Sequence, residues 1–508
     1  MSLNQTSDKR EYLSTDSDWT FALLEDYDRE IARIAKGYGL QTYPNQIEII
    51  SAEQMMDAYS SVGMPIGYNH WSYGKQFLAT QKSYQRGQMG LAYEIVINSD
   101  PCIAYLMEEN TMPMQALVIA HACYGHNSFF KGNYLFQTWT DASSIIDYLL
   151  FAKHYVRKCE ERYGSEEVER VLDACHSLQN YGVDRYRRPR PISAAEEKLR
   201  QEEREDQMQR QINDLWRTLP TYNTDEVKNK QGKFPEEPQE NLLYFLEKNA
   251  PILAPWQREL VRIVRKISQY FYPQRQTQVM NEGWATFWHY TLLNHLYDEG
   301  KVTDGFMMEV LSSHSNVVHQ PSFDSPYYSG INPYALGFNM FRDIKRICEN
   351  PTAEDYEWFP DIAGKDWLET LHFAMHNFKD ESFVQQFLSP HLMREFHLFS
   401  LYDDDERSHY EIEAIHNDSG YRKVREMLAR QYDLSVREPN IQVWSVDLQG
   451  DRSMTLRHTM QDGTPLSTDV HEVLKHLNYL WGFDIHLETY KDGKLMSKHS
   501  CPSMKVAD

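Results

Sequence analysis

The run MQALVIAHACYGHNSFF, residues 114–130, constrains the fold of this chain more than any other feature. It reads as a helix that is apolar on nearly every side, and such a helix is stable only when other elements bury it. Yet it carries His121 and His126, whose imidazoles are costly to bury unless hydrogen bonds or a metal ion satisfy them. The sequence therefore predicts a buried helix with polar side chains that need partners.

The spacing of the two histidines does not suit a metal site on a regular helix. Residues five apart on an α-helix point about 140° away from each other, whereas residues four apart differ by about 40°. Gly125 lies between them and permits a local bulge or an early end of the helix. Two interpretations stay open: a metal-binding pair, or core histidines that bond to backbone or tyrosine groups.

A second segment, residues 281–290 with the sequence NEGWATFWHY, combines a carboxylate and an imidazole with aromatic residues. Glu282 and His289 are seven residues apart, so on a helix they project within about 20° of each other. Both groups are costly to bury unpaired. The segment indicates part of a polar site, a buried Glu–His pair or a solvent-facing edge.

The third segment, residues 319–337, is a loop rich in Pro, Tyr and Gly, with the sequence HQPSFDSPYYSGINPYALG. Its phenols at Tyr327, Tyr328 and Tyr334 are able to donate hydrogen bonds to an oxyanion that develops during a reaction. Aromatic loops also serve packing alone, so a catalytic and a structural interpretation both remain.

Composition argues against several classes of function. The 508 residues carry a formal net charge of −22, which disfavours a broad surface for nucleic acid or anionic membrane. No apolar run approaches the roughly 20 residues of a membrane-spanning helix, and the first residues lack the apolar core of a secretory signal. We therefore expect a cytoplasmic protein with no membrane span and no nucleic-acid partner. The 6 cysteines are scattered, which disfavours a disulfide framework or a cysteine zinc site.

Periodicity and composition divide the chain into four segments. Residues 1–190 are mainly helical, with two short strands expected within 92–110. Residues 191–240 hold a highly charged helix and a polar linker. Residues 241–395 are helical, and 396–508 follow a β-α-β-β-α-β order that is typical of a small ferredoxin-like or ACT-like domain. The expected fold class is α+β, mainly helical.

Other patterns that look like sites are set aside. The run HEVLKH at 471–476 is one residue too long for HExxH and lies on an amphipathic helix. Glu369 and His372 have the ExxH spacing of di-iron bundles, but Glu413 and His416 lie in a strand pattern, so a second helix is missing. No phosphate-binding loop, GxGxxG or GxSxG motif is present, which disfavours nucleotide binding and α/β-hydrolase chemistry.

Taken together, the three segments resemble the order of motifs in helical zinc metallopeptidases of the Taq-type carboxypeptidase and thimet-type oligopeptidase families. In those enzymes an edge strand precedes a zinc-binding HExxH helix, a later helix supplies a Glu ligand, and a tyrosine-rich loop assists. The resemblance implies a zincin-like helical body with residues 92–110 as edge strands. It also implies a divalent metal, such as zinc, with an open position for water and the ligands His121, His126 and Glu282.

Two departures from that pattern bear on activity. Ala122 stands where the peptidases carry the glutamate that acts as general base, and one extra residue separates the histidines. The residues able to replace this base are Glu108, Glu109, His289 and Cys123, and the sequence does not select among them. The chain is therefore either a metal-dependent hydrolase acting on an amide or peptide-like substrate, or a non-catalytic descendant of such enzymes.

Over residues 15–500 the chain is similar to the stage V sporulation protein R (SpoVR) family. The motifs are long: MEENTMPMQALVIAHACYGHNSFFKGN, YGVDRYRRP, QTQVMNEGWATFWHYTLLNHLYDEGK, SGINPYALGF and WFPDIAGKDWLETLHFAM. The resemblance implies a bacterial role in spore cortex formation or in stationary-phase and stress programmes. It also implies partners, a PrkA-type serine protein kinase and a protein with a von Willebrand-type domain, for which the charged helix at 194–216 and the C-terminal domain would be docking elements.

Overall fold

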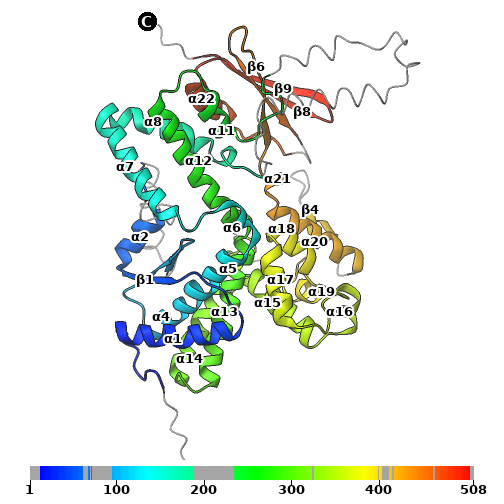
Figure 1. Ribbon diagram of the computed structural model, residues 1–508. Coiled ribbons are helices and arrows are strands. Elements are labelled where there is room, and N and C mark those ends of the chain that lie inside the picture. The colour runs from blue at the N-terminus through cyan, green and yellow to red at the C-terminus, as the bar shows by residue number, and fades with distance from the viewer. Residues whose placement is uncertain are drawn as a thin grey trace, which may run out of the picture. The chain divides into compact units, whose positions relative to one another are not determined.

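The structure is a computed structural model. It describes residues 12–60, 67–68, 70, 94–186, 234–322, 325–398, 400–402, 411–414, 417–460 and 464–503. These residues are mainly helical with small sheets, which confirms the α+β class (Figure 1). None of the helices among them is both long and apolar enough to cross a membrane.

The chain forms two compact units, which differ from the four segments expected. The first comprises Met1–Glu166 and Tyr270–Arg437, and the second comprises Glu167–Gln269 and Glu438–Asp508. Residues 396–437 thus belong to the first unit and not to a C-terminal domain. The charged helix expected at 194–216 lies outside the described residues.

The first unit is a helical body with two small sheets. Its N-terminal part contains α1 (Phe21–Gly37), β1 (Asn45–Ile50), α2 (Ala52–Ser60), β2 (Glu94–Ile97), β3 (Cys102–Met107), α4 (Met112–Val118), the π-helix η1 (Ile119–His126), α5 (Asn127–Gly132), α6 (Tyr134–Trp139) and α7 (Ile145–Tyr163). Its later part contains α13 (Gln278–Asp298), α14 (Asp304–Val317), α15 (Pro333–Glu349), α16 (Ala353–Trp358), α17 (Trp367–Asn377), α18 (Asp380–Phe387), α19 (Pro390–Glu395), β4 (Ser400–Tyr402), β5 (Glu411–Ala414), α20 (Asp418–Tyr432) and α21 (Leu434–Arg437).

Helix α13 is the centre of this body. Buried residues lie on most of its sides, and Trp284, Trp288 and Leu292 are fully buried. It packs against η1, α15, α1 and α14 (Figure 1). Its first turn is held by Asp380, whose carboxylate accepts hydrogen bonds from the amides of Val279 and Met280 at 2.9 and 2.8 Å.

Small residues bring three helices into backbone contact at α13. A Cβ atom at Gly283 would lie 2.3 Å from the carbonyl carbon of Gly337, and one at Gly125 would lie 2.5 Å from the Cα of Ala285. Only glycine permits this approach of η1 and α15 to α13. Each of the three motifs found in the sequence therefore contributes a small residue to the same packing core.

A three-stranded sheet with the order β1-β3-β2 covers one side of η1. β1 runs parallel to β3, and β2 runs antiparallel to it, with Glu94 opposite Leu106. Side chains alternate along β2, so Ile95 packs with Met55 and Met56 on one face, while Val96 packs on the main core. Glu94 shares the face of Val96 and points toward η1. The strands expected within 92–110 are confirmed.

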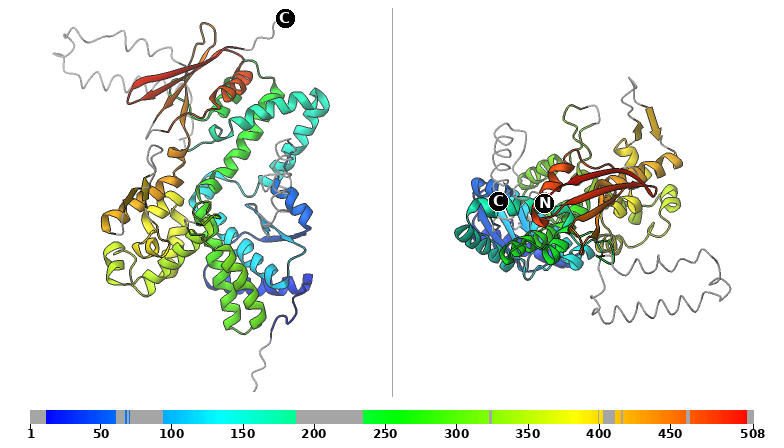
Figure 2. Two further views of the ribbon diagram at one scale, coloured as in Figure 1. Left: turned by 180° about the vertical axis from the view of Figure 1, so that it is seen from behind. Right: turned by 90° about the horizontal axis from the view of Figure 1, so that it is seen from above.

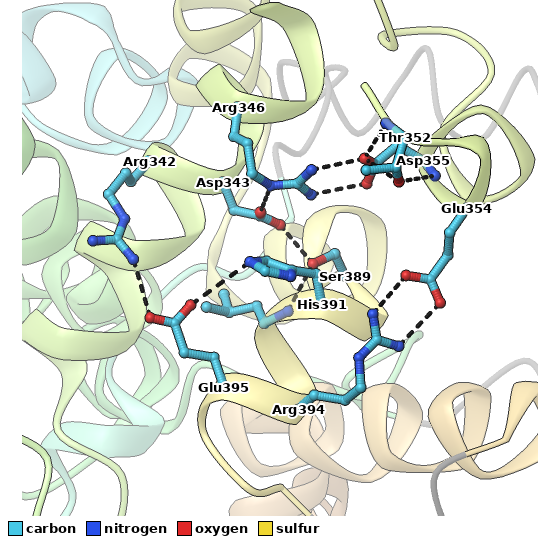
Figure 3. Close-up of polar contacts among 11 residues, drawn as sticks. Arg342, Asp343, Arg346, Thr352, Glu354, Asp355, Ser389, His391, Arg394 and Glu395 are labelled. Atoms are coloured by element: carbon cyan, nitrogen blue, oxygen red, sulfur yellow. Dashed lines mark hydrogen bonds and ion pairs between the residues drawn. The ribbon is translucent and has the colours of Figure 1, made fainter. Parts of the chain in front are cut away.

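Buried ion pairs join α15, α16 and α19, and we call them the Arg346 network (Figure 3). The Arg346 guanidinium binds Asp355 through two hydrogen bonds of 2.7 and 2.8 Å and Asp343 through one of 2.7 Å. Ser389 donates to the second oxygen of Asp343, and Thr352 to Asp355. Every carboxylate in the interior of the network therefore has a cation and a hydroxyl as partners.

The second unit contains the remaining strands and helices. A four-stranded sheet has the order β6-β7-β8-β9, with α22 against one face (Figure 2). Its described elements are η2 (Gln179–Tyr181), α11 (Leu242–Asn249), β6 (Asn440–Val446), β7 (Met454–Thr459), α22 (Val470–Trp481), β8 (Ile485–Lys491) and β9 (Lys494–Cys501), while α8 (Ser165–Ser177) and α12 (Pro255–Gln276) cross the unit boundaries.

The C-terminal topology differs from the single sandwich expected for 396–508. β4 and β5 form a separate two-stranded sheet in the first unit, beside α20. In the second unit, β7 and β8 are parallel and α22 connects them, and β9 adds a strand that the periodicity did not predict. The physical reason is that strand alternation predicts a strand and its buried face, but not its neighbour.

Candidate metal centre

The histidine pair lies in the π-helix η1. In a π-helix the backbone hydrogen bonds join residues five apart, so the side chain at i+5 takes the place that i+4 has in an α-helix. The rings of His121 and His126 accordingly lie with their centroids 4.6 Å apart. The extra residue between the histidines, a departure from HExxH, is thus accommodated by the helix type, and both rings point to one place.

Two carboxylates face the Nε2 atoms of this pair. Glu282 Oε2 lies 3.8 Å from His121 Nε2 and 3.4 Å from His126 Nε2. Glu94 Oε1 lies 3.2 and 3.9 Å from the same two atoms. We call the four side chains, which come from β2, η1 and α13, the His/Glu centre.

The dimensions of the His/Glu centre fit a metal ion. Any two ligands that bind a tetrahedral ion at about 2.05 Å lie about 3.3 Å from each other. The distances to the two Nε2 atoms are 3.4 and 3.8 Å for Glu282 and 3.2 and 3.9 Å for Glu94, so by distance either carboxylate fits as the third ligand beside the histidines. Imidazole nitrogen with carboxylate oxygen is a donor set that zinc and other divalent transition metals accept. The residues present therefore fit a divalent cation.

The pKa values of the side chains in the centre are shifted in different directions. Burial disfavours the charged form of His126, but Glu282 and Glu94 outweigh it and raise the pKa of His126 to about 9. Burial likewise disfavours a charged Glu282, but the two histidines hold its pKa well below the ordinary value. For Glu94 burial prevails, and its pKa is raised. The two carboxylates therefore differ in how readily they take up a proton.

Further side chains fix the orientation of both rings. His126 Nδ1 lies 3.0 Å from Asn281 Oδ1, to which it donates, so in the neutral form of the ring its Nε2 presents a lone pair to the centre. His121 Nδ1 lies 2.9 Å from His289 Nδ1, and His289 Nε2 lies 2.8 Å from His314 Nδ1. If each ring donates to the next, His121 Nε2 is also free to bind a cation.

His289 and His314 are neutral parts of this chain of rings. Both are buried, and burial holds the pKa of His289 well below its usual value. Burial, with smaller contributions from His121 and Arg342, lowers the pKa of His314 to about 4. His289, expected as an alternative base, thus has both nitrogens engaged with other imidazoles.

Of the three tyrosines expected to act, Tyr334 lies beside the centre. Its ring is stacked on His121 with the centroids 6.4 Å apart. Tyr328 lines a separate cavity of about 580 Å³ between the 318–331 loop, α19 and α20. Tyr327 is 83% exposed.

Neither acidic residue expected after the edge strands belongs to the buried centre. Glu108 and Glu109 are exposed in the turn that follows β3. Glu109 Oε1 accepts a hydrogen bond from the amide of Ala52, at the start of α2. Cys123 is fully buried, and burial raises the pKa of its thiol well above the usual value, so it is not a thiolate nucleophile.

The HEVLKH and ExxH patterns of the sequence do not contribute to the His/Glu centre. Glu472, in the run at 471–476, pairs with Lys475 at 2.7 Å on the exposed face of α22. His372 Nε2 bonds to the carbonyl of Tyr38 at 3.0 Å. His416 lies outside the described residues.

Sequence reasoning missed Glu94, Asn281 and His314. The signal for Glu94 was present, because it begins a strand within the segment expected to form the edge, and it shares a face with Val96. Asn281 precedes Glu282 directly, but nothing in the sequence indicates that it bonds to His126. His314 carries no signal, since its contact with His289 depends on how α14 packs against α13.

Known protein families match most of this chain. Residues 18–437 match the family model described as SpoVR like protein, and 439–492 match the one described as SpoVR-like C-terminal domain. The chain is 66% identical over 491 residues to the "Uncharacterized protein YcgB" of Escherichia coli (strain K12), and the match covers 96% of each chain. No solved structure matches. The chain therefore belongs to the SpoVR family.

Proposed function

We propose that this chain binds a divalent metal ion, such as zinc, and acts as a metal-dependent hydrolase on an amide or peptide-like substrate. The ligands are His121, His126 and Glu282. The observation that carries the proposal is the convergence of these side chains, from elements about 160 positions apart, at the separations of a tetrahedral site. Two His and one Glu leave a fourth position for water, as in catalytic zinc sites.

The bound ion would supply a Lewis acid and lower the pKa of a water molecule. The protein's own residues orient its ligands: Asn281 holds the ring of His126, and His289 holds that of His121. Tyr334 is the phenol beside His121, and it is the donor we assign to the oxyanion of the substrate. An edge strand, a histidine helix and a later glutamate helix support a zincin-like interpretation of the body.

Metal analysis tests this function. Purified protein reconstituted with Zn²⁺ and then dialysed is expected to hold about one ion per chain, measured by elemental analysis. His121→Ala and Glu282→Ala are expected to lose it, whereas His471→Ala, an exposed histidine of α22, is the matched control and keeps it. Wild-type protein that retains no metal after reconstitution would refute the proposal.

A second candidate is a non-catalytic role as a scaffold or regulatory partner of a PrkA-type serine protein kinase and a protein with a von Willebrand-type domain. Ala122, which leaves η1 without a general base, favours it. Family membership supports a role in spore cortex formation or in stationary-phase and stress physiology under either candidate.

Co-purification from stationary-phase cells separates the two candidates. A scaffold keeps its partners in the His121→Ala and Glu282→Ala variants, because docking does not need the centre. An enzyme is expected to retain a bound protein only in a variant that binds substrate without turning it over.

A further inference from the structure

The π-helix carries no group that could activate water. Ala122, which follows His121, is fully buried, and the remaining side chains of η1 other than the histidines and Cys123 are Ile119, Ala120, Tyr124 and Gly125. Tyr124 is engaged with Asp28 through a hydrogen bond of 2.7 Å. A base for the proposed reaction must therefore come from another element.

We propose that Glu94, at the start of β2, is that general base; this role rests on the proposed function. Its Oε1 atom lies 3.2 Å from His121 Nε2 and 3.9 Å from His126 Nε2, so the carboxylate faces the position where the ligands converge. A base within hydrogen-bond reach of a water at this position meets the geometric requirement for proton transfer.

The other bases considered do not have this placement. Glu108 and Glu109 are exposed in the turn after β3, and Glu109 bonds to the Ala52 amide. His289 uses both ring nitrogens, one toward His121 and one toward His314. Among the residues that the structure describes, the carboxylates that face both Nε2 atoms are those of Glu94 and Glu282.

The supporting elements divide the roles of these two carboxylates. Glu282 projects from α13. Asp380 accepts hydrogen bonds from amides in the first turn of this helix, and Gly283 allows its backbone to contact α15 closely. A side chain on such a rigid, buried helix is suited to hold a metal in fixed geometry. Glu94 begins a strand of four residues at the edge of a sheet. We therefore assign Glu282 as ligand and Glu94 as base.

In the proposed amide hydrolysis, Glu94 accepts a proton and later returns it. Glu94 takes a proton from the attacking water as the water oxygen forms a bond to the carbonyl carbon, whose π electrons move to the carbonyl oxygen. That oxygen returns its electrons as the C–N bond breaks, and the proton on Glu94 passes to the departing nitrogen. The products are a carboxylic acid and an amine, and Glu94 is again a carboxylate.

Metal affinity separates a base from a ligand without a known substrate. The experiment measures Co²⁺ binding to full-length wild-type protein, Glu94→Gln, Glu282→Gln and the surface control Glu108→Gln by absorption spectroscopy. Glu94→Gln and Glu108→Gln are expected to bind Co²⁺ within about threefold of wild type, and Glu282→Gln at least about tenfold more weakly. A loss in Glu94→Gln as large as that in Glu282→Gln would make Glu94 a ligand and overturn the assignment.

Acetohydroxamic acid then tests the role of the base. This chelator needs an open position on the ion and gives up a proton when it binds. It is expected to bind the Co²⁺-loaded wild type and Glu108→Gln equally, and Glu94→Gln about tenfold more weakly because the proton acceptor is gone. Equal binding by Glu94→Gln, or no binding by wild type, overturns the role of Glu94 while metal binding stands. Wild type that binds no Co²⁺ refutes the proposed function itself.

Discussion

The Arg346 network and the His/Glu centre are both buried groups of charged side chains in the first unit, but their carboxylates have different partners. In the network, Asp343 and Asp355 face the guanidinium of Arg346, which also accounts for the lowered pKa of Asp355, about 2 despite burial. In the centre, Glu94 and Glu282 each pair with the imidazoles of His121 and His126.

This difference distinguishes a structural group of charges from a candidate metal site. A guanidinium is charged at every relevant pH, so the network is complete without any added ion. An imidazole is charged or neutral near pH 7, and in its neutral form it offers a lone pair to a cation. The centre is therefore able to take up protons or, as we propose, a divalent metal, and the network needs neither.

The largest effect on stability is expected in the network. Arg346→Met leaves two buried carboxylates without their cation, so the free energy of unfolding should fall by about 3 to 5 kcal/mol. The matched control is Glu354→Gln, which breaks the exposed pair of Glu354 with Arg394 beside the network and should cost less than about 1 kcal/mol. Urea denaturation measures both, and equal losses would contradict the distinction.

The next effect concerns the packing that forms the centre. Gly283→Ala places a Cβ 2.3 Å from the backbone of Gly337, which forces α13 and α15 apart at the turn that carries Glu282. We expect a loss of about 1 to 3 kcal/mol in stability and weaker metal binding. Gly37→Ala, at a glycine with open space around its Cβ, is the control. Unchanged metal affinity in Gly283→Ala would show that the centre tolerates a shift of the helix.

A smaller effect is expected when a carboxylate of the centre is neutralised. In metal-free protein at pH 8, Glu282→Gln should change the free energy of unfolding by less than about 1 kcal/mol, because a histidine that loses its carboxylate partner becomes neutral. Added Zn²⁺ at 100 times the wild-type dissociation constant should stabilise wild type by about 2.7 kcal/mol, and the variant, which binds at least about tenfold more weakly, by no more than about 1.4 kcal/mol. A large loss in the metal-free variant would place the centre with the Arg346 network as a structural element.

The last effect is absent at pH 7 and develops only in acid: a pH dependence of stability that arises at His314, beside the centre. Burial lowers the pKa of His314 to about 4, whereas a histidine in the unfolded chain has a pKa near 6.5. Between these values the unfolded state binds a proton that the folded state does not, so stability falls as the pH drops from about 6.5 to 4. His314→Phe lacks this contribution.

Urea midpoints of metal-free wild type and His314→Phe, compared from pH 7 to 4, measure the difference. The variant should lose less stability over this range. The Asp355 carboxylate, with its lowered pKa of about 2, contributes stability that is lost only below this window, as the pH falls from about 4 toward 2. Parallel curves for the two proteins would contradict the burial of a neutral His314.

Several elements could be predicted from periodicity because the apolar pattern is local. The segment 114–130 is a buried helical run, and 92–110 supplies β2 and β3. The angle between His121 and His126 could not be predicted, because the pattern of a π-helix in the sequence is that of an α-helix. The acidic residues after β3 are as polar as Glu94, and which of them is buried depends on the face of the strand that meets η1.

The amino-acid sequence alone decides which chemistry is available here: imidazoles and carboxylates in apolar segments must find partners, whatever the fold. Tertiary packing decides which of them meet. Glu94, His121, His126 and Glu282 come from three elements, and the contacts at Gly125, Gly283 and Gly337 bring η1 and α15 onto α13. Such contacts are long-range, so no local pattern encodes them, and the proposal of Glu94 as base depends on the structure.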